Sequence, residues 1–307
     1  EWFTHNLTNG EVFFILYKKK IFNVDNTDDI VVGNKTYGRG QSPSYPFKTI
    51  QACAEYVASN FNIGNKTVII NINSGTYEEK LSLGSLSVTS GHIELRPYAN
   101  ASVTVKKTIE SSGSLIAVSG GNWRIYDINT NLTATGVSSS AGTQEIIDVR
   151  VSNAARCYIY NGSHTIVDST SNNPKINCFV FLSTANGSGL YIVGPRITVT
   201  NGNAGIKVYT ARYGAAISFQ SGSDEESKYT MTVNGTAEML FFGHDKGIIE
   251  RTTAGAYDPK FTGNLAAKKY QLSSGASCNI GNSFFISQAN LTEGTLSETS
   301  YCFYIGN

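Results

Sequence analysis

One stretch of the chain shows the periodicity of an amphipathic helix. After Pro46, apolar side chains recur at helical spacing, at Ile50, Cys53, Ala54, Val57 and Phe61. Pro46 stands near the first turn of such a helix, where a missing backbone N–H is tolerated. The pattern predicts a helix over residues 47–61, and no second stretch of the chain shows the same stripe.

Short apolar runs separated by Gly, Asn and Ser fill most of the remaining chain, and they predict β-strands. No helical pattern separates them, so βαβ crossovers are excluded. Most runs are also not joined by two-residue Asn-Gly or Asp-Gly loops, which argues against a meander of hairpins and leaves stacked coils. The runs are residues 67–72, 92–95, 102–105, 114–118, 123–128, 146–151, 157–160, 164–167, 177–182, 190–193, 196–199 and 206–209.

A repeat supports stacked coils. Three triplets of two apolar or aromatic residues and an aspartate, ending at Asp127, Asp148 and Asp168, recur at a nearly constant spacing. A period of roughly 20 residues is typical of solenoids and here predicts a parallel β-helix with roughly nine coils over residues 66–250. Equivalent residues of such coils stack about 4.8 Å apart. The helix over residues 47–61 is well placed to cap the open first coil.

Composition narrows the class of protein. The 307 residues carry 24 Lys and Arg against 23 Asp and Glu, and only 15% of residues are charged. This balance lacks the basic field that nucleic-acid or anionic-membrane binding needs, so we expect neither partner. Polarity comes instead from Asn, Ser, Thr and Gly, which suit turns and strand surfaces and predict an all-β protein.

The sequence implies no metal, no cofactor and no membrane insertion. The longest apolar run, residues 12–17, ends at the lysines of residues 18–20 and is too short for a membrane span of roughly 20 residues. The five Cys are scattered without a C-x-x-C pair and are expected to be buried small hydrophobes, and the four His lack metal-ligand spacing. The chain begins at Glu1 without a Met, so we expect a fragment or a processed product.

The beginning of the strand-rich region resembles a known family. Residues 46–51 (PFKTIQ), 66–72 (KTVIINI) and 74–79 (SGTYEE) are similar to the entry segment of pectin-lyase-like right-handed β-helix proteins. Pectin esterases, polysaccharide lyases and phage tail fibres or tailspikes share this opening, so the resemblance implies a fold before it implies a function. The DFIFG and LGRPW blocks of pectin esterases are absent from the sequence, which argues against an esterase.

The end of the chain is similar to the closing segment of phage tail β-helix proteins, through residues 261–270 (FTGNLAAKKY), 273–275, 280–284 and 301–306. Ala266 and Ala267 stand where Gly is usual, and Lys269 replaces Arg. The resemblance implies a tail fibre or tailspike that is part of the extracellular virion tail. It further implies a parallel homotrimer that contacts other virion tail proteins and bacterial surface polysaccharide.

Together these observations predict a right-handed, single-stranded parallel β-helix of the pectin-lyase-like class. Residues 1–45 would form an N-terminal lead-in or neck, and residues 46–260 the β-helix with its capping helix. Residues 261–307 would form a C-terminal closing β segment.

Four carboxylates are candidate catalytic residues. If Asp127, Asp148 and Asp168, together with Glu145, lie on adjacent coils, their carboxylates stack about 5 Å and about 10 Å apart. These separations approach those of retaining and inverting glycosidases, and stacked like charges raise one pKa as a general acid requires. The structural alternative is that each Asp ends its strand by accepting hydrogen bonds from turn amides.

A lyase site is the less favoured alternative. Arg150 and Arg156 with Tyr158 and Tyr160 could supply the base and the acid. Lys207 or Arg212 could then hold a uronic carboxylate.

Aromatic residues are the candidate sugar-binding groups, because their rings stack on sugar faces and their hydroxyls bond to sugar hydroxyls. Arg124 is expected on the same surface, and tyrosines are equally expected at trimer contacts. The candidate substrate-binding residues are Trp123, Tyr126, Arg150, Tyr158, Tyr160 and Tyr191.

Three functional hypotheses follow. The first is a phage or phage-like tail protein that binds host surface polysaccharide during adsorption. The second is a depolymerase, more in keeping with a glycosidase than a lyase, that cleaves capsule or lipopolysaccharide. The third is a structural shaft whose receptor-binding tip lies elsewhere.

Overall fold

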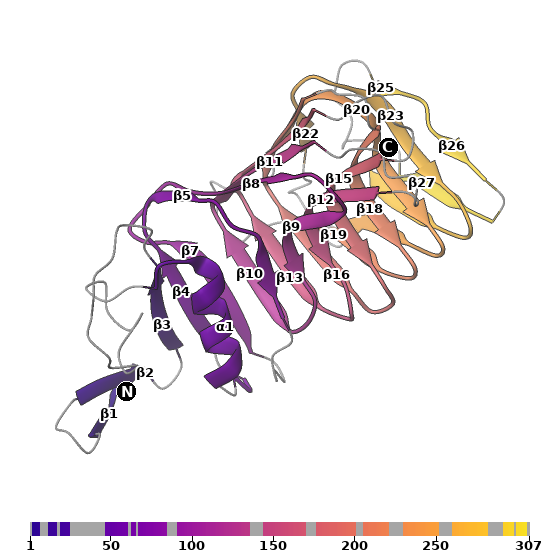
Figure 1. Ribbon diagram of the computed structural model, residues 1–307. Helices are drawn as coiled ribbons and strands as arrows, with labels where there is room; N and C mark the ends of the chain where they lie inside the picture. Colours follow the sequence, from indigo (N-terminus) through magenta and orange to yellow (C-terminus); the bar gives the residue numbers. More distant parts are fainter. Residues whose placement is uncertain are drawn as a thin grey trace.

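The fold was analysed in a computed structural model of the chain. It describes residues 2–6, 12–16, 19–24, 47–60, 63–65, 67–84, 91–135, 144–169, 176–200, 205–220, 230–251, 260–281, 291–297 and 299–305. Apart from one helix, the regular elements in these ranges are strands, and they form a parallel β-solenoid (Figure 1). The predicted all-β, parallel β-helix architecture is therefore confirmed.

Two sheets run along the solenoid. The first forms one face, which we call face 1, and its strands are parallel from β3 onward. Its order is β1 (Trp2–Asn6), β2 (Val12–Leu16), β3 (Lys19–Val24), β4 (Thr67–Ile72), β7 (His92–Pro97), β10 (Asn122–Tyr126), β13 (Arg156–Tyr160), β16 (Gly189–Val193), β19 (Ala216–Phe219), β21 (Ile248–Arg251), β24 (Ser277–Gly281) and β27 (Tyr301–Ile305).

The second sheet covers two faces, because the long strand β20 (Thr230–His244) pairs with β17 near its start and with β18 near its end. Face 2 holds β5 (Gly75–Tyr77), β8 (Val103–Ile109), β11 (Ile128–Ala134), β14 (Ser163–Asp168) and β17 (Arg196–Thr200). Face 3 holds β6 (Leu81–Leu83), β9 (Gly113–Val118), β12 (Gln144–Val151), β15 (Ile176–Thr184) and β18 (Gly205–Arg212). Beyond β20, the sheet continues through β22 (Lys260–Thr262), β23 (Leu265–Leu272), β25 (Leu291–Thr292) and β26 (Thr295–Leu296).

The coils are longer than the sequence repeat indicated. Ile125 pairs with Ile159, and Ile159 with Ile192, so each coil there takes roughly 33 residues, a length within the usual range of solenoid repeats. Five complete coils, β4–β6, β7–β9, β10–β12, β13–β15 and β16–β18, each place one strand on each face. The predicted shorter coil and the nine coils derived from it are wrong, because the three triplets end on three different elements of the coil, as described below.

Stacked apolar columns fill the interior. One column on face 1 runs through Val68, Ile93, Trp123, Cys157, Leu190, Ile217, Ile249 and Cys278, all at most 4% exposed. On face 1, alternate residues of the strands point inward, so every coil adds one layer to a continuous core. Cys53, Cys157, Cys178 and Cys278 are buried, as predicted, whereas the side chain of Cys302 lies outside the described residues.

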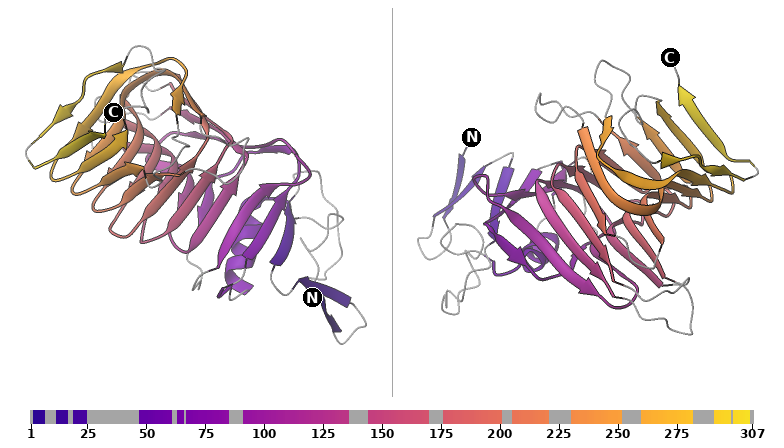
Figure 2. Two further views of the ribbon diagram at one scale, coloured as in Figure 1. Left: turned by 180° about the vertical axis from the view of Figure 1, so that it is seen from behind. Right: turned by 90° about the horizontal axis from the view of Figure 1, so that it is seen from above.

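Helix α1 (Ile50–Asn60) lies at the N-terminal end of the stack, as Figures 1 and 2 show. Its buried stripe is Ile50, Cys53, Ala54 and Val57, which belong to the main core, while the predicted stripe member Phe61 lies outside the described residues. No helix in the described ranges is long and apolar enough to cross a membrane.

The first turn of α1 is held by a residue from the SGTYEE motif. The backbone N–H groups of Ile50 and Gln51 donate to the two carboxylate oxygens of Glu79, at 2.8 and 3.0 Å. Thr49 Oγ1 accepts from the N–H of Ala52 at 3.1 Å, so a local cap and a distant carboxylate satisfy the helix terminus together. The Gln51 side chain exchanges two hydrogen bonds with the backbone of Ser82 in the edge strand β6, which covers that edge.

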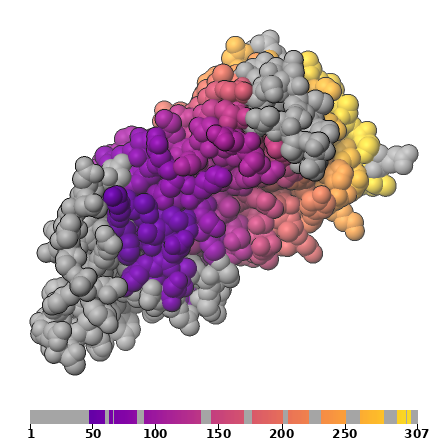
Figure 3. Space-filling model, viewed as in Figure 1, coloured from indigo at the N-terminus to yellow at the C-terminus, as the bar shows by residue number. Residues whose placement is uncertain are grey.

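The ends of the chain extend the same two sheets. Strand β3, in the predicted lead-in, pairs in parallel with β4 and begins the parallel part of face 1, and β1 and β2 add an antiparallel hairpin. In the predicted closing segment, β24 and β27 continue face 1 and β23 continues the second sheet. Figure 3 shows the resulting elongated body with side chains included.

Candidate functional site

Four of the predicted sugar-binding tyrosines converge on the outer surface of face 1. The register places Arg124, Tyr158 and Tyr191 in one column and Tyr126 and Tyr160 in the next. They alternate with inward residues such as Ile125 and Ile159, so the strand pleat turns them outward. We call Arg96, Arg124, Tyr126, Tyr158, Tyr160 and Tyr191 the tyrosine surface.

The rings of the tyrosine surface stack along the solenoid axis. The centroids of Tyr126 and Tyr160 lie 4.3 Å apart with ring planes within 5°, and those of Tyr158 and Tyr191 lie 4.3 Å apart within 12°. The Arg96 guanidinium lies 4.5 Å from the centroid of the Tyr126 ring. Because Arg96 and Tyr160 flank the Tyr126 ring and Arg124 and Tyr191 flank the Tyr158 ring, these two rings offer mainly their edges and hydroxyls to a ligand.

The positive charge of Arg96 on the tyrosine surface is neutralised by a carboxylate of the same strand. Glu94, only 4% exposed, contacts the Arg96 guanidinium at 2.6 Å and His92 Nε2 at 2.9 Å. Burial is the main cause that raises the pKa of Tyr160 to about 12, and the nearby Tyr126 adds to it. Burial is also the main cause that raises the pKa of Tyr158, and the nearby Tyr191 adds to it. Both phenols are therefore neutral hydrogen-bonding groups at physiological pH.

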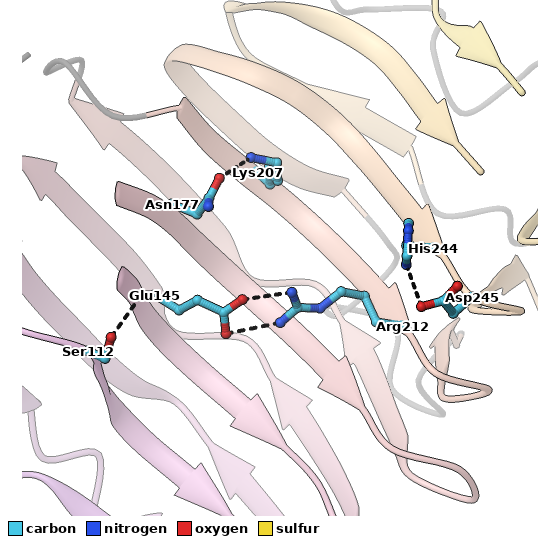
Figure 4. Close-up of polar contacts among 7 residues, drawn as sticks. All are labelled: Ser112, Glu145, Asn177, Lys207, Arg212, His244 and Asp245. Atoms are coloured by element: carbon cyan, nitrogen blue, oxygen red, sulfur yellow. Dashed lines mark hydrogen bonds and ion pairs between the residues drawn. The ribbon is translucent and has the colours of Figure 1, made fainter. Parts of the chain in front are cut away.

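The outer surface of face 3 carries a different arrangement (Figure 4). Glu145 on β12 accepts two hydrogen bonds from the Arg212 guanidinium on β18, at 2.7 and 3.1 Å. The pair spans β15, where the Arg212 guanidinium lies 5.1 Å from the centroid of the Phe179 ring. Bidentate geometry and a half-buried setting make this contact stronger than an ordinary surface ion pair.

Lys207 lies beside this pair and is more enclosed, with 9% of its side chain exposed against 14% for Arg212. Its ammonium donates to Asn177 Oδ1 at 2.8 Å and to Glu238 Oε2 at 3.0 Å, and it lies 5.5 Å from the centroid of Phe179. Further along, His244 Nδ1 lies 2.7 Å from Asp245 Oδ2. Arg212 and Lys207 each have a carboxylate partner, so these two cations offer little unpaired charge to a substrate.

A second polar cluster lies inside the solenoid. Asp148 and His164 are 0% and 1% exposed, and Thr130 is 2% exposed. Asp148 Oδ2 accepts from Thr130 Oγ1 at 2.7 Å and from His164 Nδ1 at 2.8 Å. Because hydroxyl and carboxylate meet the same ring nitrogen, the arrangement differs from a nucleophile–histidine–acid triad, in which they contact opposite nitrogens.

The predicted carboxylate ladder is not formed. Asp127 occupies an exposed left-handed position (φ 52°) at the corner between faces 1 and 2, where the register continues with Asn161 rather than with another carboxylate. Asp148 lies in the interior behind face 3, and Asp168, which is buried, pairs in register with Ala134 of face 2. Glu145 is on the outer surface of face 3 and is held by Arg212. A chain bound outside the solenoid does not reach Asp148.

Two of the predicted binding residues lie apart from the tyrosines. Trp123 is 0% exposed and donates its indole N–H to the carbonyl of Gly120 at 3.1 Å, so the expectation of a surface Trp123 is wrong. Its alternation with Ile125 places both in the core. Arg150 lies on face 3, in register with Leu182, away from the tyrosine surface.

Arg96, Thr130 and the pairing of Asp148 with His164 were not predicted from the sequence. Arg96 could have been found from the alternation of residues 92–97, which places His92, Glu94 and Arg96 on one side of their strand. The interior cluster left no such local signal.

Comparisons with known proteins bring no match: no protein-family model, curated protein or solved structure is similar to this chain. Within the described residues, no group of three or more His, Cys, Asp or Glu side chains is placed to hold a metal ion.

Proposed function

We propose that this protein binds bacterial surface polysaccharide during adsorption, as part of a phage or phage-like tail fibre or tailspike. The observation that carries the proposal is the tyrosine surface, where stacked phenols and guanidinium groups meet on one outer face of a parallel solenoid. Neutral hydroxyls that donate and accept hydrogen bonds suit the hydroxyl groups of sugars.

The finer features of the proposal come from the resemblance at residues 46–79 and 261–306 to pectin-lyase-like and phage tail β-helix proteins. They are a right-handed β-helix, a parallel homotrimer and a place in the extracellular virion tail beside other tail proteins. Sedimentation or light scattering tests the trimer directly, and a monomer at micromolar concentration would contradict the tail assignment.

The binding claim is tested with purified capsule and lipopolysaccharide from candidate hosts. The double variant Tyr158→Phe with Tyr160→Phe removes two hydroxyls and keeps both rings, so the fold is retained and we expect at least about tenfold weaker binding. Tyr213→Phe removes a hydroxyl from an exposed tyrosine outside this surface and serves as the matched control. Equal binding by the double variant and wild type would contradict a role for the tyrosine surface.

The same samples are assayed for new reducing ends and for the absorbance of unsaturated uronates. Binding without products is the result that adsorption alone predicts. Products would instead assign the protein to the depolymerases. Failure of wild type to bind any host polysaccharide would contradict the proposal and favour a structural shaft.

A further inference from the structure

A groove runs along the corner between faces 1 and 2. It has a volume of about 490 Å³, and its lining includes Ser102, Asp127, Asn129, Asn161, Arg196 and Thr232. These residues come from five successive coils, from the corner before β8 to strand β20. Four strand spacings of about 4.8 Å make the groove about 19 Å long, parallel to the solenoid axis.

The groove exists because the corner is built from small residues in left-handed conformations. Asp127 and Asn161 have φ of 52°, and Gly194 follows at 67°. At Gly162 a Cβ atom would come within 2.4 Å of the carbonyl oxygen of Ile128, so position 162 has no room for a side chain. The chain therefore turns sharply there and leaves a depression between the two faces.

Backbone N–H groups at the base of the groove already donate to carbonyl groups of the next coil. The N–H of Asp127 donates to the carbonyl of Tyr160 at 2.9 Å, and the N–H of Asn161 donates to the carbonyl of Val193 at 2.8 Å. The ladder between coils thus continues around the corner. A ligand would therefore be recognised mainly by the side chains that line the groove.

Those side chains are mostly uncharged. The lining has one cation, Arg196, and its uncharged polar side chains carry hydroxyl or amide groups: Asn100, Ser102, Asn129, Asn161 and Thr232. Asp127 adds the one carboxylate of the lining. One positive and one negative group give no field for a polyanion, whereas a row of donors and acceptors suits a chain of sugar hydroxyls.

The tyrosine surface begins one residue before the corner that holds the groove. Tyr126 and Tyr160 immediately precede Asp127 and Asn161 in the chain, and they stack in the face 1 column nearest the corner. Neither ring is part of the groove lining, but each belongs to the residue directly before one that is. Amphipathic aromatic groups beside polar ones are the usual composition of a sugar-binding cleft.

We propose that this groove binds an extended, predominantly uncharged oligosaccharide that lies parallel to the solenoid axis across several coils. The inference rests on the proposed polysaccharide-binding function and identifies its binding groove and substrate class. Length and direction follow from the fold, because the lining repeats once in each coil.

The decisive variant is Ser102→Trp, which places a large ring in the groove from an exposed position outside the core. Thr200→Trp adds the same ring at an exposed position on face 2 outside the lining and is the matched control. We expect Ser102→Trp to weaken binding of a host polysaccharide at least tenfold and Thr200→Trp to leave it unchanged. Circular dichroism verifies that both variants fold.

A second measurement uses neutral oligosaccharides of increasing length, prepared from the bound polysaccharide. The groove predicts that affinity rises with length and then reaches a plateau once the five coils are occupied. If Ser102→Trp binds as well as wild type does, the proposal that the groove binds the oligosaccharide is contradicted. Binding would then be assigned to the tyrosine surface alone. If wild type binds no polysaccharide, the proposed function itself fails.

Discussion

Two neighbouring residues of β12 reverse the usual arrangement, in which apolar side chains point into the coil and polar side chains point outward. Ile147 points outward and forms an apolar cluster with Phe179 and Leu182 on the surface of face 3, all at most 2% exposed. Asp148 points inward and joins Thr130 and His164 in the core. The solenoid therefore has an apolar cluster outside and a polar cluster inside, on adjacent residues of one strand.

A bend in the strands of face 3 explains how both clusters arise. Val180 and Phe181 of β15 both belong to the core, as do Val208 and Tyr209 of β18, although they are consecutive residues. At this bend the inward and outward alternation is interrupted, as at a β-bulge. Asp148 lies at the corresponding point of β12, between Ile147, which is in register with Phe179, and Val149, which is in register with Phe181.

The two clusters differ in how they are stabilised. The outer cluster is covered by long cationic side chains, since Lys207 and Arg212 lie over the Phe179 ring and are neutralised by carboxylates. The inner cluster is closed to water and depends on one shared acceptor, Asp148 Oδ2, while Asp148 Oδ1 and His164 Nε2 have no hydrogen-bond partner in the described part of the chain. Whether a side chain is buried in this fold therefore depends on the partners it packs against or hydrogen-bonds to, and not only on whether it points into or out of the coil.

The largest expected effect comes from breaking the inner cluster. Asp148→Ala leaves the buried His164 and Thr130 without their shared acceptor and should lower the free energy of unfolding by about 3–5 kcal/mol. The neighbouring coils carry Val105 and Ile197 in the column of Thr130 and His164. Replacing Asp148, Thr130 and His164 together by Val, Val and Ile should therefore restore or exceed wild-type stability.

Urea unfolding followed by circular dichroism measures both changes. A combined variant as unstable as Asp148→Ala would show that this cluster is not interchangeable with apolar packing. That result would contradict the view that local pairing alone decides which groups are buried.

The next effect comes from the outer cluster. Phe179→Ala should cost about 3 kcal/mol, because the ring is 2% exposed and makes core-like contacts although it points outward. Arg212→Met keeps the stem that covers the ring and removes only the ion pair with Glu145, so it should cost about 1 kcal/mol. Equal losses from the two variants in thermal unfolding would mean that charge, rather than packing, holds this surface.

The smallest effect concerns the helix cap, far from both clusters. Burial is the largest cause that raises the pKa of Glu79 in the fold, although the N–H groups of Gln51 and Ile50 oppose it. The folded state then binds the Glu79 proton more tightly than the unfolded state, so this contribution is present at low pH and is lost as pH rises through the folded pKa.

The matched variant is Glu79→Gln, which does not titrate and loses one of the two acceptor oxygens. It should cost about 1 kcal/mol near neutral pH, and the stability difference from wild type should widen at acidic pH. Unfolding midpoints measured from about pH 4 to about pH 7 test this, and a difference that grows toward neutral pH would reverse the sign.

The sequence was sufficient for the type of fold because alternation and helical periodicity are local. The stripe from Ile50 to Val57 and the runs around Ile125 and Ile159 are read within a few residues of each other. Alternation also predicts that the tyrosines lie on one surface. The outward positions of their strands are taken by Tyr126, Tyr158, Tyr160 and Tyr191. The same alternation should have placed Trp123 in the core with Ile125.

Coil length and the inner cluster depend on information that no local pattern holds. The triplets ending at Asp127, Asp148 and Asp168 recur evenly because they lie in or directly after every second strand, β10, β12 and β14, each of which is on a different face. True neighbours lie one whole coil apart, which is roughly 33 residues. His164 meets Asp148 only because face 2 packs against the bend of face 3, and that contact depends on the three-dimensional closure of the coil.

The most direct test of the central claim is a binding titration of purified host surface polysaccharide against wild type, Tyr158→Phe with Tyr160→Phe, and Ser102→Trp. We expect saturable binding by wild type and at least tenfold weaker binding by both variants, with Tyr213→Phe and Thr200→Trp unchanged. Wild-type binding that neither variant weakens would contradict recognition of the polysaccharide at this corner of the solenoid.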